Sequence, residues 1–329
     1  MKRQFCVAIL LLVLTGARAS DLTHGKYGRD FLDHGAGARY LGMGSAAVSH
    51  VNDISAIYWN PAGLGRVLSK QIHAMHDERF AGAVNWDFVG GGLPLSADGT
   101  LGFGFFRSGV DQVPLTRLRD PSRGLGDVYV DEEGRLVIND PYAYDWINQQ
   151  EMAFVVSLGR KRSETLYYGA SVRVLRKTMD RYSAWGLGFD VGAQWNPWRA
   201  LWLGGMLSDA TTTLLAWEGG NKEYFKPRLT LGASYLVDAG RFTFRPAVDL
   251  RNSLDNMGGS AQFHAGRLDM DLGVGLEVRV MRIAALRLGS FRGDLTGGAG
   301  FNVGRLALDY GFSSSSDLGD SHRISIAWL

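Results

Sequence analysis

The segment "LDMDLGVGLEVRV" (268–280) decides the fold class, because its apolar and polar residues alternate. Every even position from Met270 to Val280 is apolar, and the odd positions carry aspartate, glycine, glutamate or arginine. A period of two residues is typical of a β-strand with one apolar face. The segment also has the length that a tilted strand needs to cross a bilayer, ~9–11 residues.

The same alternation recurs after residue 70, for example at 185–195 and at 305–312. We therefore expect an all-β fold with an even number of strands. The expected strands are 70–78, 83–93, 99–107, 150–159, 165–176, 184–196, 200–209, 227–238, 241–251, 269–280, 283–292, 295–302, 305–313 and 321–329.

The lengths of the connections separate a membrane barrel from a soluble β-sandwich, which shows the same alternation. Short connections such as "PWR" (197–199) follow the even-numbered strands, whereas the segments 108–149, 210–226 and 252–268 follow odd-numbered ones. Short turns at one rim and long loops at the other are typical of outer-membrane barrels. The sequence therefore predicts a transmembrane antiparallel β-barrel of about 14 strands over residues 70–329.

The polar faces of these strands carry charges of both signs. If the apolar faces meet lipid, the charged side chains line a confined lumen, where they must pair or stay hydrated. Mixed signs favour an ion-pair lattice around something that fills the lumen over a wide charge-selective pore. The expected lumen charges are Arg173, Arg228, Arg245, Arg251, Arg279, Arg287, Arg305 and Arg323, with Asp190, Asp249, Asp269, Asp271, Glu277 and Asp309.

Four tryptophans lie near the rim that carries the short turns: Trp195, Trp198, Trp202 and Trp328. Indole rings prefer the interface between membrane and water, with the ring inward and the N–H hydrated. We expect these four side chains to lie at the membrane–water interface of that rim.

The first 19 residues have the pattern of a secretory signal peptide. Two basic residues precede a ten-residue apolar run, and "ARA" (17–19) is a small-x-small cleavage site. We expect residues 1–19 to be removed together with Cys6. The formal charge then falls from +2 to −1, because three basic residues and no acidic one leave. The basic pI is therefore no argument for a nucleic-acid partner.

The composition of the remaining chain agrees with export to an outer membrane. It contains no apolar run near the ~20 residues that a membrane helix needs. Glycine accounts for 44 of the 329 residues and proline for only 8. Glycine within strands suits sharp curvature and close approach of another backbone.

The segment from residue 20 to 69 precedes the expected barrel and contains "SAIYWNPAGLG" (55–65). Asp53 is expected to cap the N-terminus of a short helix, and Asn60 that of a second turn, which begins at Pro61. Gly63 then helps to release the chain. We expect a compact hatch that sits inside the barrel.

No motif for catalysis, a cofactor or a metal is found in the sequence. His73 and His76 are three positions apart on an expected strand, so they face opposite sides and do not share a metal. Ser321 and His322 are adjacent and also point apart. The sequence therefore predicts a protein that is not an enzyme and has no cofactor.

The stretch "GAGARYLGMGSAAVSHVNDISAIYWNPAGLG" (35–65) resembles the N-terminal signature of the PorV/PorQ family of outer-membrane barrels, which are related to FadL-type transporters. The resemblance continues in 109–118, 211–235 and 306–329. It implies a fourteen-stranded barrel whose lumen is blocked by an N-terminal hatch. The sequence departs from the pattern of that family at two positions. Asn52 replaces the first residue of an Asp-Asp pair, and Leu329 replaces a terminal phenylalanine.

The resemblance also implies a structural or gating role for five residues of this hatch motif: Asp53, Trp59, Asn60, Pro61 and Gly63. As in PorV/PorQ proteins, the barrel would be a scaffold linked to protein secretion, with secreted cargo or translocon components as partners beside outer-membrane lipid. The alternative is a FadL-type channel for hydrophobic small molecules, which would bind a hydrophobic ligand or detergent in the barrel.

Overall fold

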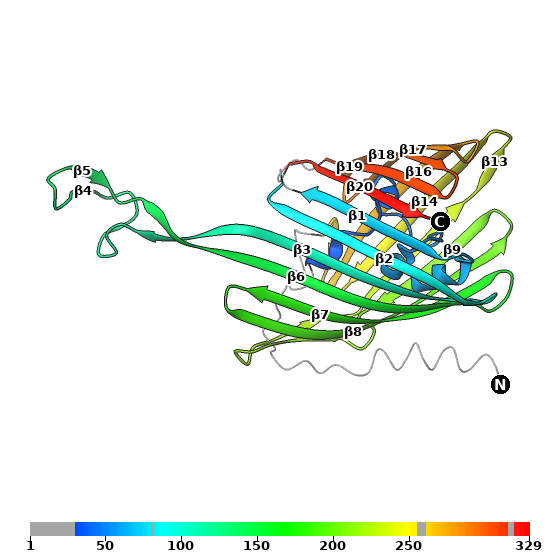
Figure 1. Ribbon diagram of the computed structural model, residues 1–329, viewed down its shortest axis with the longest axis horizontal. Coiled ribbons are helices and arrows are strands. Elements are labelled where there is room, and N and C mark those ends of the chain that lie inside the picture. Colours follow the sequence, from blue (N-terminus) through cyan, green and yellow to red (C-terminus); the bar gives the residue numbers. More distant parts are fainter. Residues whose placement is uncertain (1–29, 80–81, 255–260, 315–318) are drawn as a thin grey trace.

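The computed structural model describes residues 30–79, 82–254, 261–314 and 319–329. The predicted signal peptide (1–19) and the first part of the predicted hatch (20–29) lie outside the described residues. The described part of the chain is a barrel from which one long hairpin projects (Figure 1).

Fourteen long strands form the wall of the barrel. Their bounds are β1 (Gln71–Arg79), β2 (Val84–Ser96), β3 (Gly99–Leu118), β6 (Pro141–Lys161), β7 (Leu166–Met179), β8 (Tyr182–Trp198), β9 (Leu201–Ser208), β12 (Arg228–Tyr235), β14 (Phe242–Ser253), β16 (Leu268–Val280), β17 (Ala284–Phe291), β18 (Asp294–Val303), β19 (Leu306–Ser313) and β20 (Ser321–Trp328). Each pairs antiparallel with two neighbours.

The sheet closes on itself where β1 meets β20, with Ile72 opposite Trp328 and Glu78 opposite His322. Among the described residues, closure gives each of the fourteen wall strands a partner on both sides. This allows a sheet to sit in lipid, where unpaired backbone groups have no water to bond to. The predicted antiparallel barrel of about 14 strands is confirmed.

The alternation of side chains follows the predicted in-and-out register. Leu276 and Leu308 point outward and are 40% and 45% exposed, whereas Glu277 is 1% exposed. Asp271 and Asp249 are also buried. Apolar side chains therefore cover the outer surface, and charged ones face the lumen.

Part of the polar pattern was assigned wrongly. Arg305 lies exposed in the turn between β18 and β19, where its guanidinium stacks on Trp328 at 5.2 Å, so it is not a lumen charge. Trp202 faces the lumen, where the guanidinium of Arg66 lies 3.8 Å from the centre of its ring. The other three tryptophans of the predicted rim group are exposed.

The predicted loop over 108–149 is instead an antiparallel arm. β3 and β6 continue their pairing to Leu118 opposite Pro141, well beyond the wall, and the short strands β4 (Val128–Val130) and β5 (Leu136–Ile138) form a hairpin at the tip (Figure 1). The other short strands extend the barrel sheet. They are β10 (Thr213–Trp217), β11 (Lys222–Phe225), β13 (Val237–Ala239) and β15 (Phe263–Ala265).

The N-terminal segment, residues 30–67, lies within the ring of strands (Figure 1). It contains four short helical elements: η1 (Asp30–Asp33), α2 (Ala38–Leu41), α3 (Ala56–Trp59) and η2 (Pro61–Arg66). Most of its described side chains are buried. The role of this segment as a hatch stays a prediction.

In the described part of the chain, helices with the length and apolar character needed to cross a membrane are absent.

Charged substitutions on the outer face test the register. Leu276→Arg and Leu308→Arg are each expected to lower the free energy of unfolding from a bilayer by ~2–4 kcal/mol, because the new charge meets lipid near mid-membrane. The measurement is a urea titration of folding into vesicles. Leu136→Arg, at the exposed tip of the arm, is the control and should change nothing. Equal effects at all three positions would show that the outward assignment is wrong.

Candidate functional site

Glycines of the barrel wall let the backbone of the N-terminal segment lie directly on the strands. A Cβ at Gly275 in β16 would come 2.2 Å from the carbonyl oxygen of Met43, and one at Gly204 in β9 would come 2.4 Å from that of Val48. Real Cβ atoms do not approach other atoms so closely. The segment is therefore seated on positions of the wall that only glycine can occupy.

Asn60 is the polar anchor of this contact. Its Oδ1 accepts a hydrogen bond from the backbone N–H of Ala62 at 3.1 Å, which confirms it as the cap of the turn that begins at Pro61. Its Nδ2 donates to the carbonyl oxygen of Val48 at 2.8 Å and to that of Ala193 in β8 at 3.1 Å. One side chain thus joins the turn, the preceding loop and the wall.

The neighbours of Asn60 in the predicted motif fix the shape of the segment. Trp59 donates from Nε1 to the carbonyl oxygen of Ala36 at 2.6 Å. Pro61 packs on β7, where a Cβ at Gly169 would lie 2.4 Å from its carbonyl carbon. A Cβ at Gly63 would come 2.3 Å from the carbonyl oxygen of Val51, so this glycine is needed for packing within the segment itself.

Asp53 does not cap the helix as predicted, because α3 begins two positions later and Ser55 stands at its N-cap. Asp53 instead accepts hydrogen bonds from the backbone N–H of Ser55 at 2.9 Å and from the hydroxyl of Tyr40 at 2.8 Å. Burial alone would raise the pKa of the Asp53 carboxyl. The charges of Arg39 and His73 and the hydrogen bonds from the side chains of Ser55 and Tyr40 outweigh burial and lower that pKa below its ordinary value.

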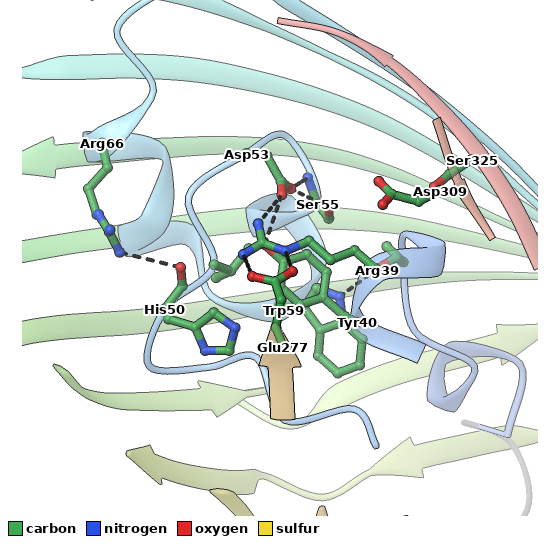
Figure 2. A network of polar contacts seen from close by, with 12 residues as sticks. Arg39, Tyr40, His50, Asp53, Ser55, Trp59, Arg66, Glu277, Asp309 and Ser325 are labelled. Atoms are coloured by element: carbon green, nitrogen blue, oxygen red, sulfur yellow. Dashed lines mark hydrogen bonds and ion pairs between the residues drawn. The ribbon is translucent and has the colours of Figure 1, made fainter. Parts of the chain in front are cut away.

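Arg39 joins the N-terminal segment to strand β16 of the wall. It donates from Nε and Nη2 to the two carboxylate oxygens of Glu277 at 2.9 and 3.0 Å (Figure 2). Arg287 and Arg279 also contact Glu277, through Nε atoms at 2.8 and 2.9 Å. Arg287 further pairs with Asp309 at 2.6 Å, so the predicted ion-pair lattice is confirmed here.

Two further side chains of the wall hold the loop before α3. Gln194 in β8 donates from Nε2 to the carbonyl oxygens of Val48 and Val51 at 3.2 and 3.0 Å. Asp249 in β14 accepts from the backbone N–H groups of Ala47 and Val48. The sequence did not predict these contacts, although Gln194 and Asp249 both fall on the polar face of the predicted strands.

The described histidines do not form a metal site. His73 is buried and His76 is exposed, as expected for residues on opposite faces of one strand. Within the described ranges, clusters of three or more histidine, cysteine or acidic side chains suited to a metal ion are absent.

Solved structures with a similar fold include a toluene transporter, a monoaromatic hydrocarbon channel and a FadL homologue. The structure of the toluene transporter TodX from Pseudomonas putida aligns with a TM-score of 0.57 and 12% identity, over 89% of this chain and 96% of that one. The CymD monoaromatic hydrocarbon channel gives the same values. A FadL homologue from Pseudomonas aeruginosa aligns with a TM-score of 0.55 and 12% identity, over 89% and 98%.

No family model matches the chain, and no curated protein sequence matches it either. At 12% identity the structural likeness shows a FadL-like barrel fold and nothing more. None of the three comparisons shows membership of the PorV/PorQ family.

A double-mutant cycle between Asn60 and Gly192 tests the anchor. A Cβ at Gly192 would lie 2.1 Å from Asn60 Oδ1, so Gly192→Ala is expected to cost ~1–3 kcal/mol through overpacking. Asn60→Ala should cost a similar amount, ~1–3 kcal/mol, by removing the cap and leaving carbonyl groups unbonded. The double variant should lose less than the sum, because the smaller side chain removes the clash.

Thermal unfolding of the detergent-purified variants measures these costs. Gly205→Ala is the matched control in the adjacent strand, since a Cβ there meets only Leu231 at an ordinary 3.5 Å. Strict additivity of the two substitutions would contradict the contact between Asn60 and Gly192.

Proposed function

We propose that this protein is an outer-membrane channel for apolar small molecules, and that the segment comprising residues 20–69 is a hatch that closes it. The protein reaches that membrane by means of the signal peptide at 1–19. It is not an enzyme in this proposal. The structural neighbours named as a toluene transporter and a monoaromatic hydrocarbon channel support a solute of this class.

The observation that carries the proposal is an apolar patch on the lumen wall. Lumen-facing positions of barrels are ordinarily polar. Here Trp86, Phe88 and Phe106 on β2 and β3 are fully buried in the lumen, and the rings of Phe88 and Phe106 stack at 4.6 Å. An aromatic wall offers an apolar solute a surface that a polar lumen lacks.

The hatch covers this patch with isoleucine side chains that enter glycine positions of the wall. A Cβ at Gly92 would lie 2.3 Å from Ile54 Cδ1, and a Cβ at Gly102 would lie 2.9 Å from Ile57 Cγ1. These two contacts are apolar, and the patch is also joined to the segment by a hydrogen bond that Trp86 donates from Nε1 to the carbonyl oxygen of Gly35 at 2.7 Å. The interface between the isoleucines and β2–β3 is therefore the path that an apolar solute would follow.

Truncating one of these isoleucines is expected to speed transport. Ile54→Ala removes part of the side chain that fills the space at Gly90 and Gly92, so uptake of a hydrophobic fluorescent probe into proteoliposomes should rise severalfold. The same change should cost ~2–5 kcal/mol of stability. Ile324→Ala, on the lipid face, is the control. Unchanged uptake through a folded Ile54→Ala barrel would contradict this path.

Removal of the hatch gives a second test. A barrel lacking residues 20–68 should still insert, because its fourteen strands close without the segment, and its conductance in planar bilayers should exceed that of the intact protein. Heat modifiability on gels verifies folding of both forms. If the folded truncated barrel conducts no better than the intact one, the segment does not close the lumen.

A secretion scaffold of the PorV/PorQ type is the second candidate, and the arm of β3 and β6 favours it. The tip strands β4 and β5 expose Val128, Val130, Leu136 and Ile138, which form two directly opposed pairs on one face. An exposed apolar face far from the membrane suits contact with another protein, such as secreted cargo or a translocon component. Deleting residues 119–140 should impair secretion and spare probe uptake in this case.

A further inference from the structure

A small pocket lies between the N-terminal segment and the wall, on the side of the long loops. Its volume is about 60 Å³. At ~10–15 Å³ for each water, this is room for about four water molecules or one small solute. It is lined by Leu32, Asp33, Val48, Tyr58, Trp59, Arg173, Met206, Ser208, Asp209, Arg228, Thr230 and Arg251.

Two of the three arginines in the lining are neutralised by aspartates. Arg228 holds both carboxylate oxygens of Asp33, with Nη2 3.1 Å from Oδ2. Arg173 bridges Asp190, at 3.0 Å, and Asp209. These ion pairs satisfy the charges of their members within the wall.

Arg251 has no such partner among the described residues. It is 9% exposed, and its Nη1 atom is buried without a hydrogen bond. The carboxylate opposite it in the sheet, Asp271, is bonded to Arg292 at 2.6 Å and to the backbone N–H of Gln262. The guanidinium lies over the ring of Phe291, 4.8 Å from its centre.

An isolated buried charge is unfavourable unless a counterion or water compensates it. The cavity beside Arg251 provides space for such a partner, and the hydroxyl-bearing residues Ser208 and Thr230 line the same space. The apolar groups Leu32, Val48 and Met206 bound it and would keep bulk water from screening the charge.

We propose that this cavity is a binding site for a small anion, either a short carboxylate such as acetate or an inorganic oxyanion such as phosphate, with Arg251 as its cationic ligand. The site is distinct from the apolar contact between Ile54, Ile57 and β2–β3, and it does not depend on the proposed channel function.

Calorimetric titration of the detergent-purified mature protein tests the site. Sodium acetate and sodium phosphate are titrated separately at constant ionic strength, which is set with sodium gluconate as an anion too large for the cavity. We expect saturable binding of at least one of the two small anions and an upward shift of the thermal midpoint in its presence. Which of the two anions binds shows whether the site takes a carboxylate or an inorganic oxyanion. If neither anion shows saturable binding, the proposal is overturned.

The variant Arg251→Gln should weaken this binding at least tenfold. In gluconate, this variant should unfold at the same temperature as the unsubstituted protein or at a higher one, since the substitution removes an uncompensated buried charge. If Arg251 had a structural role only, the substitution would lower the unfolding temperature. Arg305→Gln, at the exposed turn, should bind as the unsubstituted protein does. Binding that is equally strong in Arg251→Gln overturns the assignment.

A cavity-filling variant keeps the test decisive if Arg251→Gln fails to fold. Thr230→Leu retains the arginine and fills the cavity with a larger apolar side chain. This variant should abolish both the saturable heat of anion binding and the rise of the thermal midpoint in the presence of the anion. Undiminished binding in a folded Thr230→Leu protein would place the anion elsewhere and overturn the proposal.

Discussion

The close contact between a glycine-lined wall and the backbone of the N-terminal segment is the constraint on which the arrangement inside the barrel depends. At Gly169, Gly204 and Gly275, from three different strands, a single added carbon would lie within 2.4 Å of the segment. Side chains on the wall would force the segment out of the lumen. The high glycine content of the chain is therefore explained by packing against a second backbone as well as by curvature of the barrel.

The two sides of the segment contact the wall through different kinds of interaction. Toward β2 and β3 the contact is mainly apolar, with Ile54 and Ile57 against glycines and aromatic rings. Trp86 and Thr100 add hydrogen bonds to backbone carbonyl oxygens of the segment there. Toward β16 and β17 it is ionic, with Arg39 on Glu277, which Arg287 also contacts. Apolar contact is non-directional, whereas a buried ion pair holds one geometry and leaves an uncompensated charge when it breaks.

The strands were predictable and the contacts of the site were not, for reasons that follow from particular residues. In β16 the alternation from Met270 to Val280 reports directly which side chains meet lipid. Beyond the membrane both faces of β3 and β6 meet water, so the pattern fades and the arm resembles a loop. Arg39 and Glu277 are 238 positions apart, and no local signal encodes their pairing. The capping role of Asn60 could be predicted because a cap depends on neighbouring residues. Its hydrogen bond to Ala193 could not be predicted, because the two residues are far apart in the sequence.

The difference between the two sides determines which part of the segment can move. Separation at β2 and β3 exposes apolar surface at a cost roughly proportional to its area, so small displacements cost little. Displacement at β16 breaks the bidentate contact of Arg39 with Glu277. Glu277 keeps Arg279 and Arg287, whereas the buried guanidinium of Arg39 is left with Asp53, at 3.6 Å, as its carboxylate. The ionic side therefore acts as the fixed attachment of the segment. In the proposed channel, an opening that leaves the segment in the barrel would begin on the aromatic side, where an apolar solute would replace the isoleucine contacts that it displaces.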